Sequence, residues 1–180
     1  MKETVKKLLS FIEESPTAFH AAAEMKKRFL EAGFLELKEE DHWELKAGGN
    51  YFVTRNSSAL LAFSIPQTLP MKFHIMASHS DSPAFKIKEN PEIVVENAYV
   101  KLNVEPYGGM LMAPWFDRPL SVAGRIVIEE EGELKERLLC VDRDLLMIPS
   151  LAIHMNREAN KGYAYQAQKD LLPLYGTAEA

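Results

Sequence analysis

Apolar side chains in the first part of the chain recur with the spacing of a helix. One set is separated by three or four positions and would line a single helix face: Val5, Leu8, Leu9 and Ile12. Ser15 followed by Pro16 predicts the start of a second helix, with the serine as N-cap and the proline at the first helical position. We expect this helix to run to about Ala32, because Gly33 is typical of a C-terminal cap.

After Phe34 the pattern changes to short runs with strand character. Three of them are separated by clusters of glycine, asparagine and serine, which predicts hairpins: 43–46, 51–54 and 59–63. A fourth run, 72–77, is more apolar and is predicted to be a central strand. The chain up to about Lys88 therefore predicts an α/β layer.

The second half of the chain is richer in runs of β type. They occupy 93–95, 98–104, 120–128 and 134–141. The acidic, glycine-containing segment 129–133 joins the last two and predicts a hairpin with a solvated tip. A short helix is expected at 151–156. We therefore predict an α/β fold in two parts, an α/β layer at 1–88 and a mostly β unit at 89–180.

Composition and charge narrow the class of protein. With 180 residues and 47% hydrophobic content, the chain is large enough to bury a core. The formal net charge is −5 and no basic stripe is visible, so nucleic acid is not an expected partner. No apolar run approaches the roughly 20 residues of a membrane span. We expect a cytoplasmic protein that does not contact a membrane.

The single cysteine and three of the histidines are expected to have structural or surface roles. Cys140 lies in an apolar run, which predicts a buried thiol. His20 falls on the second predicted helix, and His42 lies in a polar segment that we expect to be exposed. His74 is predicted to be a surface or packing residue, because its odd spacing from His79 would turn it to the opposite side of a strand.

The strongest signal for a functional site is the segment 77–83, with the sequence ASHSDSP, which follows the fourth apolar run. In open α/β sheets, ligands bind beyond the carboxyl ends of strands. His79 and Asp81 are two residues apart, so both side chains point to the same side of an extended backbone. The carboxylate can then accept a hydrogen bond from one ring nitrogen while the other binds a metal. The tripeptide from His79 to Asp81 also fits a loop at a strand end that is held by hydrogen bonds and has no functional role.

Another alternative is an α/β hydrolase that uses Ser78 or Ser80 as its nucleophile. Such enzymes place the nucleophilic serine in a turn framed by glycines. No glycine flanks either serine in this sequence, which disfavours that interpretation.

A series of motifs, in order along nearly the whole chain, resembles the M18 (aspartyl aminopeptidase) family of metallo-aminopeptidases. The N-terminal motifs are 15–20, 43–45, Gly48, Tyr51, 55–56, 79–83, Lys86 and Lys88. Those that follow are 107–109, 115–118, 123–125 and 148–154. No single motif is decisive, but this many in sequence make coincidence improbable.

The resemblance implies a fold and an assembly. In that family a metallopeptidase α/β domain is interrupted by an inserted β-rich dimerisation domain, which matches the break expected near Lys88. The segment 115–118 is interpreted as an aromatic anchor with an Asp117/Arg118 pair that braces the dimerisation domain. Subunits assemble into dimers and then into a larger tetrahedral shell.

The resemblance also implies site residues. His79 would be a ligand of a two-metal centre, usually zinc and sometimes cobalt or manganese, and Asp81 would be the catalytic-site aspartate that orients it. His154 would reach into the active site of a neighbouring subunit and help to hold the peptide substrate. Without the resemblance, His154 would be interpreted as a satisfied histidine on a short helix.

The implied activity is the metal-dependent removal of N-terminal residues, possibly acidic ones, from peptides. In the family pattern the bridging carboxylate, the general-base glutamate and the other metal ligands follow the inserted domain. We therefore expect this chain to lack most of the active site and to be inactive alone. The alternative is a non-catalytic oligomerisation or interaction module from a truncated M18-like protein.

Overall fold

The computed structural model describes residues 2–68 and 72–178, which form a mixed α/β structure with two compact units. The first unit comprises 1–82 and 123–140, and the second comprises 83–122 and 141–180. Within the described residues, no helix combines the length and the apolar character needed to cross a membrane. The predicted α/β fold class is confirmed.

The first unit begins with the two predicted helices, α1 (Glu3–Glu13) and α2 (Ala18–Glu31). The predicted N-cap of the second helix is wrong. Thr17, rather than Ser15, caps α2, because its backbone is extended and its hydroxyl accepts a hydrogen bond from the His20 amide at 3.4 Å.

The C-terminal end of α2 is closed by the predicted glycine. Gly33 adopts a φ of 80°, and its amide donates to the carbonyl of Leu30 at 3.0 Å. The next amide, that of Phe34, donates to the carbonyl of Phe29 at 2.9 Å, and the two phenylalanine rings lie 4.8 Å apart. This is a Schellman cap with its apolar contact.

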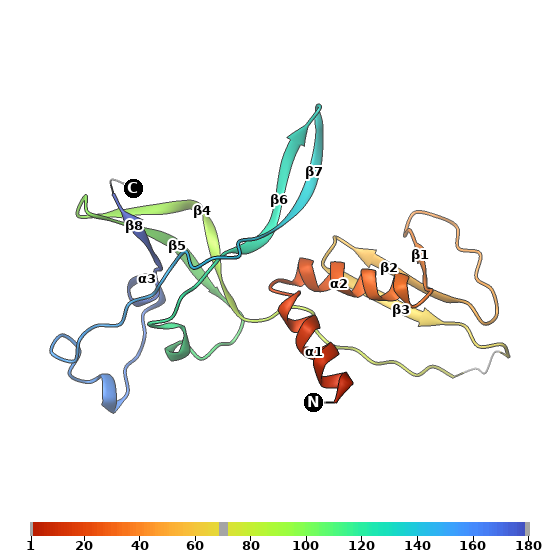
Figure 1. Cartoon of the computed structure of the whole chain (residues 1–180), viewed down its shortest axis with the longest axis horizontal. Helices are drawn as coiled ribbons and strands as arrows, with labels where there is room; N and C mark the ends of the chain where they lie inside the picture. Colours follow the sequence, from red (N-terminus) through yellow and green to blue (C-terminus); the bar gives the residue numbers. More distant parts are fainter. Residues whose placement is uncertain (1, 69–71, 179–180) are drawn as a thin grey trace. The chain divides into compact units, whose positions relative to one another are not determined.

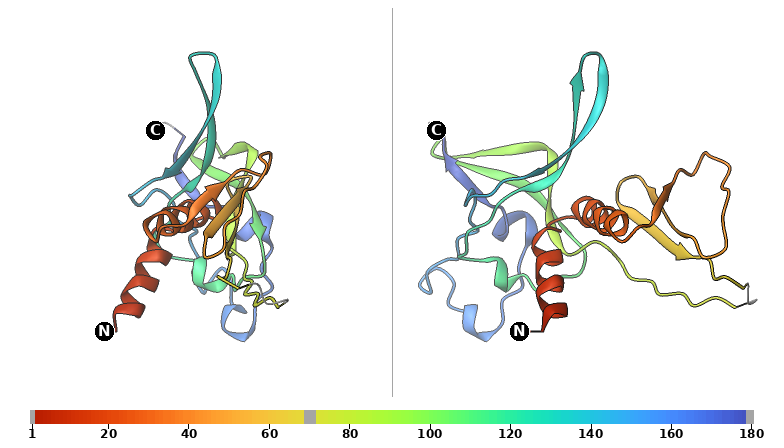
Figure 2. Two further views of the ribbon diagram at one scale, coloured as in Figure 1. Left: turned by 90° about the vertical axis from the view of Figure 1, so that its right-hand side faces the viewer. Right: turned by 45° about the vertical axis from the view of Figure 1, so that its right-hand side comes forward.

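Helix α2 packs on a three-stranded sheet with the order β1-β2-β3 (Figures 1 and 2). The strands are β1 (Leu35–Leu37), β2 (Asn50–Arg55) and β3 (Ala59–Ser64); β1 runs parallel to β2, and β3 antiparallel. The core of this unit joins Ala21 and Ala22 of the helix with Tyr51, Phe52 and Val53 of the central strand. Strands β2 and β3 were predicted, whereas β1 was not.

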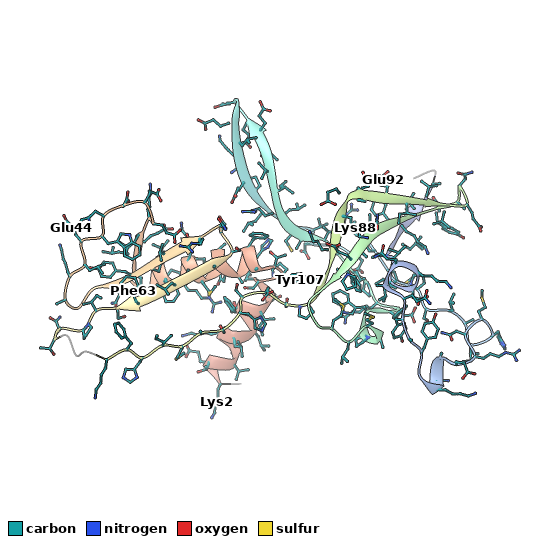
Figure 3. All side chains as sticks on the ribbon, turned by 180° about the vertical axis from the view of Figure 1, so that it is seen from behind. Lys2, Glu44, Phe63, Lys88, Glu92 and Tyr107 are labelled. Atoms are coloured by element: carbon teal, nitrogen blue, oxygen red, sulfur yellow. The ribbon has the colours of Figure 1, made fainter. Side chains whose placement is uncertain are left out.

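Two further predicted strands of the first unit are wrong. Residues 43–46 form no strand, and Trp43 is held by side-chain contacts instead. Its ring stacks on that of Phe63, which is labelled in Figure 3, with the centroids 6.1 Å apart. Its indole nitrogen donates to the carbonyl of Lys38 at 2.7 Å.

The segment 72–82 is extended but pairs with no strand among the described residues. The predicted central strand at 72–77 is therefore wrong for this structure. Phe73, Ile75 and Met76 are 90%, 84% and 99% exposed. A central strand needs a neighbour on each side to satisfy its backbone groups, and the described residues supply neither.

The predicted hairpin is confirmed as β6 (Ala123–Glu130) and β7 (Glu133–Cys140), which pair over their full length. Glu131 and Gly132 both have positive φ, as a two-residue hairpin turn of type I′ requires. Cys140, at the end of β7, is exposed, so the predicted buried thiol is wrong. A two-stranded ribbon has no interior in which to enclose it.

The second unit is built on β4 (Ala84–Val95), β5 (Tyr99–Tyr107) and β8 (Leu174–Thr177), in the order β4-β5-β8. The register of β4 shifts between Ile87 and Glu92, a stretch that contains Pro91. Lys88 and Glu92 of this strand are labelled in Figure 3. Proline cannot donate to a ladder, so it is found at such irregularities.

Three short helices complete the second unit: η1 (Ala113–Trp115), η2 (Ala159–Lys161) and α3 (Ala167–Asp170). Its core contains Val104, Leu146, Ile148 and Leu171. The predicted helix at 151–156 is wrong: only a turn forms there, with the Met155 amide donating to the carbonyl of Ala152 at 2.8 Å.

Candidate functional site

His79 and Asp81 lie side by side on the extended segment of the first unit. The Nδ1 atom of His79 is 3.0 Å from Oδ1 of Asp81 and 2.8 Å from the backbone carbonyl oxygen of the same residue. The histidine side chain is 82% exposed, and that of Asp81 is 39% exposed. Contact of Nδ1 with two acceptors favours a proton on that nitrogen, which leaves the lone pair on Nε2.

Ser80, between them, points to the other side of the segment. Its hydroxyl donates to the carbonyl of Ser58, in the β2–β3 turn, at 3.0 Å. In extended backbone, alternate side chains face opposite sides, so this bond directs His79 and Asp81 away from the turn. The same bond occupies the hydroxyl of Ser80 and disfavours its use as a nucleophile.

His79 fits a metal centre as a single ligand. A neutral imidazole with its second nitrogen hydrogen-bonded to a carboxylate is a common arrangement around protein-bound zinc. Residues 2–68 and 72–178 contain no group of three or more His, Cys, Asp or Glu side chains that could hold an ion. Among the described residues, His79 and Asp81 could therefore offer a metal one ligand nitrogen and one supporting carboxylate.

His154 belongs to the second unit, whereas His79 and Asp81 belong to the first. It is exposed and lies in the turn that follows Ile148 and Pro149. The other three histidines are not brought to this site as ligands. His20 contacts Thr17, with Nδ1 2.8 Å from Oγ1. His42 is exposed, as expected, and His74, expected to be a surface or packing residue, is also exposed.

Asp117 has a different partner from the predicted one. Its carboxylate accepts hydrogen bonds from the amide of Ser150 at 2.9 Å and from the hydroxyl of Ser150 at 2.5 Å. Among the ion pairs of the described residues, none joins Asp117 to Arg118. The hydrogen bond from the Ser150 hydroxyl, and to a lesser extent that from the Ser150 amide, holds the pKa of the Asp117 carboxyl below its usual value. Nothing in the local sequence pattern linked two residues so far apart.

Comparison with known proteins identifies the family. The family model described as Aminopeptidase I zinc metalloprotease (M18) matches residues 11–180. The chain belongs to the M18 family. A probable M18 family aminopeptidase 2 of Clostridium acetobutylicum is 49% identical over 178 residues, which cover 97% of this chain and 41% of the relative.

Solved structures agree with this assignment to the M18 family. The chain matches a structure of the Ape4 and Nbr1 complex with a TM-score of 0.90 and 37% identity, over 96% of this chain and 34% of that one. It matches mApe1 of Chaetomium thermophilum with a TM-score of 0.85 and 32% identity, over 96% of this chain and 40% of that one. A dodecamer of S. cerevisiae mApe1 matches with a TM-score of 0.76 and 24% identity, over 96% of this chain and 38% of that one.

The coverage of these matches is unequal. They take in almost all of this chain, yet the chain spans only about two fifths of the length of the curated M18 relatives. The M18 proteins that it resembles therefore contain a large further region that this sequence does not include.

Proposed function

We propose that the chain is part of a metal-dependent aminopeptidase that removes residues from the N-terminus of peptides. Its membership of the M18 family, whose model is described as a zinc metalloprotease, supports the proposal. The observation that carries it is the contact between His79 and Asp81, because this pair has the geometry of a metal ligand and its orienting carboxylate.

In the proposed enzyme, His79 binds one of two divalent metal ions through Nε2. Asp81 holds the imidazole ring in place and keeps the proton on Nδ1. Zinc is the metal that the family description favours. Cobalt and manganese are the alternatives that we propose. Metal ions in such a centre supply Lewis-acid activation of the scissile carbonyl and of water.

The remaining ligands and the general-base glutamate are proposed to lie in the region that the longer M18 relatives possess. A catalytic metal is normally held by three or more protein ligands. The described residues contain no cluster of three such side chains, and His79 is the one ligand that we propose they contribute.

The peptide substrate is proposed to be held partly by His154, supplied to the active site of a neighbouring subunit. This role requires a homo-oligomer, and the S. cerevisiae mApe1 structure, which shares this fold, is a dodecamer. The exposure of His154 suits contact with a partner. The second unit would then serve as the dimerisation domain.

Substrate preference and location follow from the same proposal. We propose a cytoplasmic enzyme that acts on peptides, possibly with acidic first residues. The net charge of −5 supports the expectation that nucleic acid is not a partner.

The test compares two exposed histidines on the same extended segment of the full-length protein. His79→Ala should reduce zinc content and lower kcat/KM by more than about 100-fold, since even the loss of a residue that supports a ligand costs 10- to 100-fold. The matched control His74→Ala should retain both. Zinc is measured by elemental analysis and activity with aminopeptidase substrates. Full zinc content and wild-type activity in His79→Ala would contradict the proposal, and an inactive wild-type protein would favour an interaction module.

A further inference from the structure

Asp117 has a backbone conformation that side chains seldom adopt. It directly follows Phe116, the C-cap of η1, and its φ is 55°. Residues with a Cβ enter this left-handed region at a cost, and aspartate tolerates it better than most. Such a residue persists only where its surroundings hold it firmly.

Three hydrogen bonds hold Asp117 against one short segment, 148–150. Its amide donates to the carbonyl of Ile148 at 3.0 Å, and its carboxylate accepts from both the amide and the hydroxyl of Ser150. Phe116 also forms an isolated parallel bridge with Ile148. Ile148 is fully buried in the core of the second unit. The left-handed turn at Asp117 therefore holds Ser150 in place two residues after the buried Ile148.

In the described part of the chain, the six residues that follow Ser150 have no comparable anchor. Residues 151–156, which we name the His154 loop, form a turn closed by their own backbone, with the Asn156 amide donating to the carbonyl of Ala152 at 3.2 Å. Leu151, Ile153 and Met155 are 55%, 47% and 75% exposed. For the residues that the structure describes, Ser150 is the last before this loop to be hydrogen-bonded to a distant segment. The position of the loop thus depends on where Ser150 is held.

We propose that Asp117 is a positioning residue for substrate binding, which acts through Ser150 to fix the start of the His154 loop. The inference rests on the proposed role of His154 in a neighbouring subunit's active site. Asp117 touches neither substrate nor metal in this scheme. Small displacements of a binding group can lower the rate of an enzyme by about 100-fold, so an anchor four residues from His154 matters.

The test uses the full-length enzyme and variants at both ends of the anchor. Asp117→Ala should lower kcat/KM by about 10- to 100-fold, mainly through KM, with zinc content unchanged. Asparagine tolerates the same backbone conformation and keeps an acceptor for the Ser150 amide. Asp117→Asn should therefore retain most of the wild-type kcat/KM. Ser150→Ala, which loses only the hydroxyl, should give a smaller loss in the same direction, and it serves if Asp117→Ala does not fold.

A double-mutant cycle with His154→Ala separates positioning from general stability. If Asp117 acts through His154, then Asp117→Ala or Ser150→Ala should add no further loss in the His154→Ala background. Losses that multiply, or wild-type kinetics of both anchor variants, would overturn the inference while leaving the role of His154 intact. Wild-type kinetics of His154→Ala would overturn that role, and this inference with it.

Discussion

Asp81 offers the His79 ring two acceptors, and only one of them depends on the side chain. The backbone carbonyl, 2.8 Å from Nδ1, remains in any variant, whereas the carboxylate at 3.0 Å does not. Asp81→Ala in the full-length protein should therefore weaken zinc binding toward the lower end of the roughly 10- to 100-fold range for lost supporting residues. Asp81→Asn keeps an acceptor without the charge, so its zinc affinity should lie between those of the wild type and Asp81→Ala. Zinc titration measures both, and affinities equal to wild type would contradict the orienting role.

Gly33 gives a second prediction at the residue scale. Its φ of 80° is costly for any residue with a Cβ, although an added Cβ would meet nothing within 4 Å. Gly33→Ala should therefore lower the free energy of unfolding by about 1 kcal/mol through backbone strain alone. Gly109→Ala is the matched control, because its Cβ also meets nothing and its φ lies outside the left-handed region. Urea denaturation compares them, and equal losses would remove the strain argument.

Single residues were predictable from sequence where the cause was local. The glycine stop of α2 was found because only glycine adopts that conformation cheaply. The N-cap was assigned to Ser15 rather than Thr17, since both residue types cap helices and the choice depends on which backbone is extended. The bond between Asp117 and Ser150 joins segments 33 residues apart in sequence. Such contacts leave no spacing pattern to detect.

At the scale of elements, α2 carries an ion pair along its own surface. Arg28 donates to Glu24 at 2.7 Å, and Lys27 lies 3.6 Å from the same carboxylate. The hydrogen bond from Arg28, and then the charges of Lys27 and Arg28, lower the pKa of Glu24 from 4.5. The pKa of Glu24 is lower in the folded protein than in the unfolded chain. The ion pair therefore stabilises the fold at pH values above the unfolded pKa, and this stabilisation is lost as the pH falls through the folded pKa.

Glu24→Gln should consequently flatten the acid side of the stability profile below pH 4.5. Glu31→Gln, at the exposed end of the same helix, is the control. Thermal melting followed at a series of pH values makes the comparison. A Glu24→Gln profile that keeps the wild-type slope would show that the pair contributes nothing to the pH dependence.

Helices and hairpins were predictable because their partners are close in sequence. Runs 51–54 and 59–63 pair through a tight turn at Asn56 and Ser57, and β6 and β7 pair through Glu131 and Gly132. Run 72–77 has the composition of a strand, but composition does not supply a neighbour. The parallel strand β1 was missed because three residues are too few to show a period.

At the scale of the whole molecule, the 180-residue chain alone should show no peptide hydrolysis and no zinc-dependent rise in melting temperature. The described residues contain no cluster of three ligands, and one histidine binds zinc only weakly. Scanning calorimetry with and without zinc, together with an aminopeptidase assay, tests this. Robust hydrolysis by this chain would mean that a complete site forms without further residues.

The boundary expected at Lys88 remains a prediction about domains. The compact units change at Ser82 and Pro83, and the first unit also takes in the hairpin 123–140. Arg125 of that hairpin lies over the ring of Phe19 at 4.3 Å and donates to the carbonyl of Asn56 at 3.2 Å. A change of composition along the chain cannot reveal such a return, because it arises from long-range contacts.

The extended segment around His79 has a practical consequence for handling pieces of this protein. Phe73, Ile75 and Met76 form an uncharged, β-prone stretch whose backbone pairs with no strand among the described residues. Open edges of this kind recruit other chains into aggregates. A fragment that carries the segment uncovered should precipitate on concentration, while co-expression with the further region of the longer M18 relatives should keep it in solution.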